Sequence, residues 1–432
     1  MNKKWLTKGI ICGVTMSAVL AYPLITLAET TRPDAGKVLE ELKQSERKLP
    51  PRQDTKLKVE EKKREPVGAD NDIQFAVTSF RITGQDLFAE NDLLPLVADA
   101  KNREHTLASL EQLTRRITKY FHEKGYIMAR AYIPAQSIDQ GVVEIAVMVG
   151  RYDQVVIRDK TGISSRATGL QLGPVQAGAY IEKHALEQAV WLLGDLAGTE
   201  AKASLAPGER PGTSTLFIDL LPKGNRVRGS ISIDNYGNRY TGYTQYSANT
   251  VINNSQGQGD SLAISAVTTG QGLLNGSLTY NVPVLRQGGR LELTVSRMNY
   301  ELGDTYASLD ATGTANTVEM SYIQTFKRSK EASLYGQISY ADKKLKDYVG
   351  GSSTADKSAR VTTFTLRGDS LDIWGGGGAN AWSLGYATGK IDNTTVNTSQ
   401  IFGKWNFTAV RQQYINDRLT GLLSASGQWS DR

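Results

Sequence analysis

The chain has 432 residues, one cysteine, three histidines and a formal net charge of +6. A positive charge this mild, spread over this length, does not indicate a nucleic-acid partner. Because the only cysteine, Cys12, lies within the first 28 residues, the rest of the sequence excludes disulfide bonds and cysteine-based metal sites.

Residues 1–28 have the pattern of a secretory signal peptide. A start with three lysines precedes an apolar run, and small residues end the segment before Glu29. The alternative is an uncleaved membrane anchor. However, the run is only about 18 residues long, near the lower limit for crossing a bilayer, and Gly13 and Pro23 interrupt it. We therefore expect cleavage after Ala28 and an exported protein.

Residues 29–72 are predicted to hold one short helix and a linker. Residues 34–48 could form a helix with Val38, Leu39 and Leu42 on one side, ended by Pro50-Pro51. The stretch that follows is charged and poor in apolar residues, which is typical of a solvated linker. A disordered tail is the alternative for the whole segment.

Residues 73–150 are predicted to form a compact α+β module. A strand over residues 73–82 leads into an acidic, leucine-rich helix near residues 89–100. A second helix is capped by Thr106, ends at Gly125 and carries an apolar stripe at helical spacing: Leu107, Leu110, Leu113, Ile117 and Phe121. Strands are predicted at 126–133 and 142–149, and the second of these alternates so as to bury one face.

Residues 151–223 follow a similar order. A strand is predicted at 153–158, a helix at 182–193, and two strands near 201–205 and 213–221. Two successive modules of about 75 residues with the same pattern indicate a tandem repeat.

Residues 224–432 are predicted to form a transmembrane β-barrel. Eleven of the twelve prolines precede residue 225, whereas thirteen of the nineteen tyrosines follow it, a composition that suits long strands. About ten or eleven segments alternate with a period of two, each long enough to cross a bilayer as a tilted strand. A soluble β-sandwich also alternates. The barrel is favoured because the alternation runs through the last 208 residues, its polar faces are rich in Ser, Thr, Asn and Gln, and Tyr and Trp gather near segment ends.

Motifs for enzyme chemistry are weak. His105, His122 and His184 lack metal-ligand spacing, so no metal site is expected. Gly-Asp-Ser-Leu occurs at 259–262 and 368–371, as in some esterases, but no histidine follows to activate the serine, which favours a turn entering a strand. The glycine run 375–378 lacks the Lys-Ser/Thr of a phosphate loop and is expected to be a turn. We expect no enzyme activity, no cofactor and no ATP-driven step.

Spaced motifs in the first module resemble those of one known family. They are Ile117-Thr118-Lys119-Tyr120, Gly125-Tyr126, Arg130-Ala131-Tyr132, Pro134, Gln136 and Gly141-Val142-Val143. This set resembles the first POTRA (polypeptide-transport-associated) module of TpsB transporters. These are the outer-membrane partners of two-partner secretion and include haemolysin and haemagglutinin exporters such as ShlB and FhaC. Where the family usually has Glu-Gly at the close of the module, this chain has Val149-Gly150.

Later motifs continue the resemblance in order over roughly residues 34–345. They include Pro207-Gly208, Asp234-Asn235-Tyr236-Gly237, Thr241-Gly242, Tyr280-Asn281-Val282-Pro283 and Tyr300-Glu301-Leu302-Gly303. The family has about sixteen strands and a lumen loop bearing Arg-Gly-Tyr/Phe, and neither is found here. Because an even strand number is expected for closure, we expect a fragment of two tandem POTRA modules and an incomplete barrel that lacks about five strands.

The resemblance implies an outer-membrane pore, with its POTRA modules in the periplasm, that exports an unfolded exoprotein without ATP. An edge strand beside a helix could accept the client as an added strand. The resemblance assigns this groove to Tyr126, Arg130, Tyr132 and Gln136, although these residues could simply pack the module. It likewise makes Val38, Leu39 and Leu42 a pore-plugging helix, and Asp234, Asn235 and Gly237 a barrel-entry motif.

The expected partners are the client, outer-membrane lipid, the barrel assembly machinery and periplasmic chaperones. Two alternatives remain open at this point. One is a β-barrel insertase of the same superfamily, which usually carries more than two POTRA modules. The other is a passive porin, which would carry none.

Overall fold

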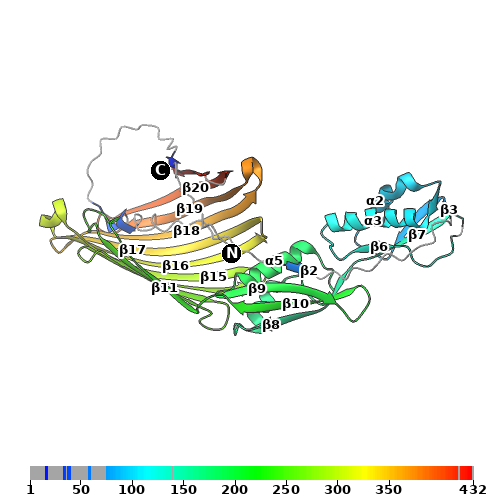
Figure 1. Ribbon diagram of the computed structural model, residues 1–432. Helices are drawn as coiled ribbons and strands as arrows, with labels where there is room; N and C mark the ends of the chain where they lie inside the picture. The colour runs from blue at the N-terminus through cyan, green and yellow to red at the C-terminus, as the bar shows by residue number, and fades with distance from the viewer. Residues whose placement is uncertain are drawn as a thin grey trace, which may run out of the picture.

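The computed structural model describes residues 15–17, 33–35, 37–39, 57–59, 74–138, 140–416 and 419–430. Two small α+β modules and a large curved antiparallel sheet follow one another in space as they do along the chain (Figure 1). The predicted fold class is thereby confirmed. Leu42 and most of the predicted signal peptide lie outside the described residues. In the part of the chain that is described, no helix is long and apolar enough to cross a membrane.

The first module packs one long helix against a three-stranded sheet in the order β4-β7-β6. The side chain of Thr106 caps this helix by accepting the Ser109 N–H at 3.3 Å, and the predicted stripe is buried except for Leu107, which is 40% exposed. The elements are β3 (Gln74–Val77), β4 (Ser79–Thr83), α2 (Glu90–Leu93), η1 (Leu94–Ala100), β5 (Arg103–Thr106), α3 (Leu107–Glu123), β6 (Arg130–Tyr132) and β7 (Val142–Met148).

Three predictions for this module were too long. The strand over 73–82 divides at Thr78, whose hydroxyl and N–H donate to the carbonyls of Gln140 and Gly141, so that β3 pairs with β5 and β4 with β7. The helix over 89–100 has only four α-helical residues before a 3₁₀ turn, because Pro95 has no N–H to donate. Residues 125–129 form turns instead of beginning the strand.

The second module repeats the sheet order of the first. Its elements are β8 (Arg151–Asp159), α4 (Ser165–Leu172), α5 (Lys183–Gly194), β9 (Thr199–Pro207) and β10 (Thr213–Pro222). β10 pairs in parallel with β8 and antiparallel with β9, just as β7 pairs with β4 and β6. The helix α4, which was not predicted, begins where the Ser164 side chain caps the Ala167 N–H.

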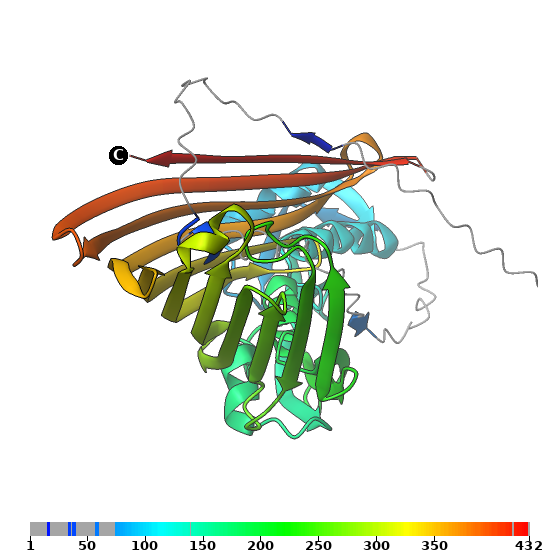
Figure 2. The same ribbon diagram turned by 90° about the vertical axis from the view of Figure 1, so that its left-hand side faces the viewer.

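The large sheet has eleven consecutive antiparallel strands, in agreement with the predicted ten or eleven. No ladder among the described residues joins β11 to β21, so the sheet is an open trough (Figure 2). The short strand β1 (Thr15–Ser17) pairs in parallel with β21. The strands are β11 (Val227–Asp234), β12 (Gln245–Asn253), β13 (Ser261–Thr268), β14 (Leu273–Leu285), β15 (Gly289–Leu302), β16 (Ala311–Arg328), β17 (Ala332–Val349), β18 (Ser352–Asp372), β19 (Gly378–Asn393), β20 (Thr398–Asn416) and β21 (Leu419–Ser430).

The register separates the two faces of this sheet. Ile338, Phe364 and Leu384 are 44%, 50% and 43% exposed and lie on the outer face. Inner-face positions on the same strands carry small or polar side chains such as Ser339 and Ala359. Apolar side chains that face outward and polar ones that face inward are typical of a membrane barrel around a wet lumen.

Two predicted turns differ in outcome. Gly259-Asp260 does form a turn that enters β13, but residues 368–371 lie within β18 rather than in a turn. Residues 374–376 form a single 3₁₀ turn before β19, as predicted for the glycine run.

Candidate functional site

A short helical segment lies against the inner face of the sheet, at the strand ends farthest from the second module (Figure 1). Residues 35 and 37–39 are helical. Ala35, Val38 and Leu39 are 0%, 2% and 9% exposed. They pack against a set of apolar inner-face side chains: Leu273, Met298, Tyr300, Leu302, Ala311 and Ala315. Two of the three residues expected to plug the pore therefore lie inside the trough.

Polar contacts fix the start of this segment. Asp347 on β17 is 2% exposed, and its Oδ1 accepts the Ala35 N–H at 3.1 Å and the Tyr300 hydroxyl at 2.6 Å. Asp34 caps the helix by accepting the Lys37 N–H at 3.0 Å, and its other oxygen receives the Lys357 ammonium at 2.9 Å. Asp34, Tyr300, Asp347 and Lys357 thus form one polar cluster that holds the start of the segment against β15, β17 and β18.

The second module closes the opposite end of the trough. The Asp195 carboxylate, which follows α5, receives the Arg328 guanidinium through two bonds of 2.7 and 2.9 Å. The Trp191 ring lies 4.7 Å from the same guanidinium. Backbone bonds from Ser164 to Gly257 and from Gln287 to Leu170 join the module to two strand turns.

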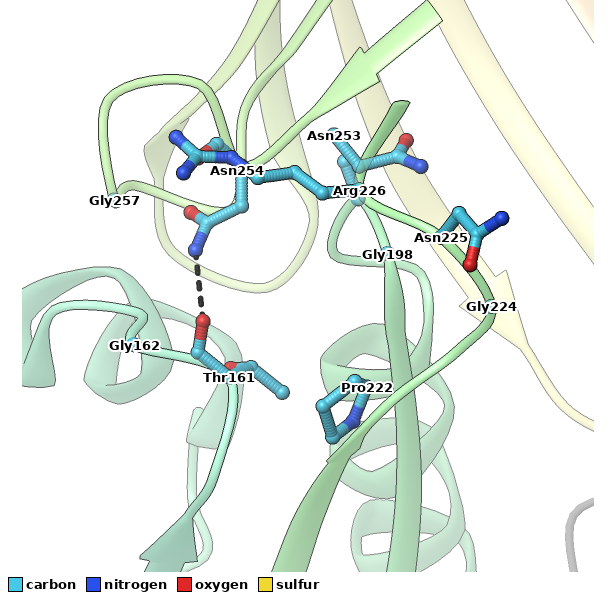
Figure 3. Close-up of a pocket in the computed structure, with 11 residues that line it drawn as sticks. Thr161, Gly162, Gly198, Pro222, Gly224, Asn225, Arg226, Asn253, Asn254 and Gly257 are labelled. Atoms are coloured by element: carbon cyan, nitrogen blue, oxygen red, sulfur yellow. Dashed lines mark hydrogen bonds between the residues drawn. The ribbon is translucent and has the colours of Figure 1, made fainter. Parts of the chain in front are cut away.

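A pocket of about 360 Å³ lies at this junction (Figure 3). The Asn254 amide donates to the Thr161 carbonyl at 3.1 Å across it, and Arg226 donates to the Asn254 carbonyl at 3.2 Å. Gly198 has φ +77°, and a Cβ there would lie 2.8 Å from the Asn253 side chain, so only glycine fits. No carboxylate lines the pocket. We interpret it as a joint between module and sheet.

The four predicted groove residues divide into two groups. Arg130 and Tyr132 lie exposed on β6, an edge strand next to α3. Tyr126 instead packs its ring against Phe88 and Tyr180, with centroids 6.0 and 6.3 Å away. Gln136 pairs both ends of its side-chain amide with the backbone of Glu144, at 2.8 Å each. The last two have structural contacts within the molecule.

One edge of each small sheet is already engaged. On β6, the Ala131 N–H donates to Thr118 Oγ1 at 2.9 Å, and His122 Nε2 lies 3.0 Å from the Ala129 carbonyl. On β9, the linker strand β2 (Leu57–Val59) pairs in parallel along Ala203–Leu205. An incoming strand would therefore have to displace side chains of α3 at the first edge and the linker at the second.

The predicted barrel-entry motif lies at the far end of β11, away from the second module. Asp234 ends the strand and accepts the Tyr236 N–H at 3.1 Å. Gly237 donates to the Tyr243 carbonyl at 2.8 Å, and a Cβ there would lie 2.1 Å from the Gly242 oxygen. The motif closes the turn between the first two large strands, because its glycine permits this close backbone approach.

Several residues at these sites carried no sequence signal. Asp347, Lys357, Asp195 and Arg328 lie far apart in sequence from their partners, so only the folded register brings them together. Among the described residues no three His, Cys, Asp or Glu side chains gather as a metal site. His105 Nε2 instead lies 2.8 Å from the Ala100 carbonyl.

Paired α+β modules at the mouth of a sheet with an apolar outer face and a polar inner face define a POTRA-bearing outer-membrane barrel protein. The chain belongs to the ShlB/FhaC/HecB family of haemolysin secretion/activation proteins, whose family model matches residues 212–432. The ShlB-type POTRA domain model matches residues 75–150. The large sheet is thus a partial barrel in the outer membrane, and the POTRA domain lies in the periplasm.

Individual relatives are distant but cover much of the chain. The heme/hemopexin transporter protein HuxB of Haemophilus influenzae is 23% identical over 354 residues, which are 79% of this chain and 62% of that protein. The outer membrane transporter CdiB of Dickeya dadantii is 24% identical over 393 residues, 85% of this chain and 68% of that protein. The solved structure of CdiB from Escherichia coli has a TM-score of 0.70 at 21% identity, over 85% of this chain and 70% of that one. These relatives are named as transporters and not as enzymes.

Proposed function

We propose that the chain exports an unfolded exoprotein across the outer membrane, through the lumen of its barrel and without ATP. The client is a haemolysin-like or adhesin-like polypeptide. It is delivered by periplasmic chaperones and caught by the POTRA modules, and the plug leaves the lumen before it passes. Like other outer-membrane barrels, the protein itself is inserted into lipid by the barrel assembly machinery.

The plug inside the trough is the observation that carries this proposal. A pore for small solutes needs no removable closure. A pore wide enough for a polypeptide would leak ions unless a segment filled it. Residues 33–35 and 37–39 supply such a closure from outside the barrel sequence, and their described polar contacts with the sheet include the Ala35–Asp347 hydrogen bond and the Asp34–Lys357 ion pair. Small inner-face side chains such as Ser339 and Ala341 offer a moving chain few places to bind.

The POTRA edges supply the client contacts. Strand addition uses backbone hydrogen bonds, so it tolerates many client sequences. On the first module, β6 offers Arg130 and Tyr132 beside its edge. On the second, the client would compete with β2 for the edge of β9. The relatives named as transporters support this assignment of a transport role.

The test is binding of a purified secretion domain of a two-partner exoprotein to the mature chain in detergent. Ala131→Pro removes the edge N–H that an added strand would use, and we expect affinity to fall about tenfold. Thr118→Val is the matched control, because it removes the same Thr118–Ala131 bond but leaves the N–H available. We expect this variant to bind at least as tightly as the parent.

Absence of measurable affinity in the parent chain, across several secretion domains, would count against export. Equal losses in both variants would place the binding surface elsewhere than the β6 edge. Export can be measured separately, as exoprotein released into the medium by cells that carry each variant.

A further inference from the structure

The outer wall of β16–β20 has a border of charge at each end of its apolar belt. Along the belt the outward side chains are mostly apolar or aromatic. One end of the belt is marked by Val318 and Ile401, which are 52% and 68% exposed, and the other by Phe326 and Trp382, which are 57% and 39% exposed. Val318 and Phe326 lie eight residues apart along β16, and both face outward. At about 3.3 Å per residue and a tilt near 40°, they span roughly 20 Å, close to the apolar band of a barrel.

A groove of about 430 Å³ is cut into this belt. Gly336 has no side chain to fill the wall, and Phe326 leans over it. The Tyr386 and Trp405 rings, with centroids 4.8 Å apart, form one side. The remaining walls are mostly apolar, with Ile338, Phe364, Leu366 and Leu384 among them. A groove of this lining suits a hydrocarbon chain.

Cations gather at the end of the belt away from the POTRA modules, in the same cross-strand row as Val318 and Ile401. Arg360 and Lys390 lie directly opposite each other on neighbouring strands, are 52% and 46% exposed, and share one carboxylate, Asp392, at 3.2 and 2.9 Å. Like charges directly opposite on a sheet repel. Asp392 and Asp342, the latter directly opposite Arg360 on β17, are two carboxylates for the three cations Lys344, Arg360 and Lys390. Lys344 is exposed on the adjacent strand and on the same face.

The cations and the groove are aligned along the strands. Arg360 precedes Phe364 by four residues on β18, and Lys390 follows Tyr386 by four on β19. The separation is about 13 Å along each strand. The opposite border differs, because its Arg411 is held by Asp372 through bonds of 2.7 and 3.1 Å and also contacts Gln413.

We propose that this wall binds one phosphorylated lipid of the outer leaflet, with a phosphate among Lys344, Arg360 and Lys390 and an acyl chain in the groove. The charge excess lies on the side of the membrane away from the periplasm, where the outer leaflet carries phosphorylated glycolipid. The site rests on the membrane placement of the barrel and does not depend on which client is exported. An anionic phosphate also relieves the repulsion between Arg360 and Lys390.

Native mass spectrometry of the purified mature chain, titrated with three lipids, tests the site. The probes are diphosphorylated lipid A, the same lipid after removal of its phosphates, and phosphatidylglycerol. We expect retention of the diphosphorylated lipid, and a loss of about tenfold or more in affinity for the variant Lys344→Gln/Arg360→Gln/Lys390→Gln. Lys343→Gln/Lys404→Gln, which changes inner-face lysines on β17 and β20, is the matched control and should bind as the parent does.

Three results would overturn the proposal: equal binding of the dephosphorylated lipid, equally tight binding of phosphatidylglycerol, or the same loss in the inner-face control. The lipid series on the parent chain answers the first two even if the triple variant fails to fold. Lys390→Gln alone is then the second variant, because it removes one member of the like-charged pair. It should lower affinity for the diphosphorylated lipid without lowering the melting temperature.

Discussion

Asp347 has two neighbours that make its carboxylate costly to replace. It is 2% exposed, and it accepts hydrogen bonds from the backbone of the plug and from Tyr300. A bond to a charged group contributes about 1.5–3 kcal/mol, and a buried donor left without its partner costs a similar amount. Among the described residues, the plug is therefore held by this side chain, by the Asp34–Lys357 ion pair and by the apolar contacts of Val38 and Leu39.

We expect Asp347→Ala to release the plug. In planar bilayers the variant should show longer open times and higher mean ion conductance than the parent, because the Ala35 N–H and the Tyr300 hydroxyl lose their acceptor. Asp342→Ala is the control, since it removes a carboxylate from the same strand but from the outer face. Identical conductance in all three proteins would show that Asp347 does not hold the plug.

Tyr152 offers a residue-scale test of the second module. Its side chain is buried, 1% exposed, and its hydroxyl has no hydrogen-bond partner among the residues that the structure describes. Burial raises the pKa of Tyr152 above its ordinary value, with a further contribution from the charge of Glu182. We expect Tyr152→Phe to be neutral or to stabilise the module by up to about 1 kcal/mol, because it removes an unpaired polar atom and leaves the ring in place.

The pH dependence has a definite sign. Because the folded-state pKa of Tyr152 is raised, its neutral form stabilises the fold fully below the unfolded value near 10, and this stability is lost as the pH rises further. Above that pH, the melting temperature of the mature chain in detergent should therefore fall less steeply with rising pH for Tyr152→Phe than for the parent. A steeper fall in the variant would contradict the assignment.

At the scale of elements, the strand β2 occupies an edge that a client would use. Its three residues pair along β9 through a parallel ladder. Lys58→Pro removes one N–H from this ladder, worth about 1 kcal/mol. If the edge of β9 binds the client, affinity should rise about fivefold. Lys58→Arg keeps both the N–H and the positive charge and should change nothing. A rise in that variant would trace the effect to the side chain rather than to the lost N–H.

The ion pair Asp195–Arg328 joins the second module to β16. Its side chains are 27% and 13% exposed, so the pair is only partly screened by water. We expect Asp195→Ala to loosen the joint by about 2 kcal/mol, measured as faster trypsin cleavage after Lys223, which lies between module and barrel. The exchange Asp195→Arg/Arg328→Asp should restore slow cleavage. Persistent fast cleavage in the exchanged protein would indicate that geometry rather than charge holds the joint.

Element types were predictable where periodicity was long, and boundaries were not. The stripe on α3 and the alternation in β14–β18 indicate their structures directly, because burial of one face imposes the period. The division of β3 from β4 at Thr78 depends on the distant Gly141, and the helix α4 has too weak an apolar face to be seen. Such features are decided by tertiary contacts.

At the scale of the whole molecule, the sequence predicted the order of parts but not how they meet. The plug residues Val38 and Leu39 were identifiable by resemblance, whereas their partners on β15 and β16 lie more than 200 residues away in sequence. The same holds for the four residues of the predicted groove, whose contacts in the fold differ. Exposed Arg130 and Tyr132 cannot be distinguished by sequence from Tyr126 and Gln136, which contact other parts of the fold.

The proposed export function depends on a sheet that has one face toward lipid and the other toward water. A cysteine scan of residues 362–367 tests it most directly, in a background where the single native cysteine, Cys12, lies in the predicted signal peptide. In reconstituted vesicles we predict that a water-soluble maleimide labels cysteines placed at Thr363 and Thr365 and spares those placed at Phe364 and Leu366. A quencher dissolved in the lipid should instead reach the last two positions. Equal labelling at all six positions would contradict the membrane-spanning sheet.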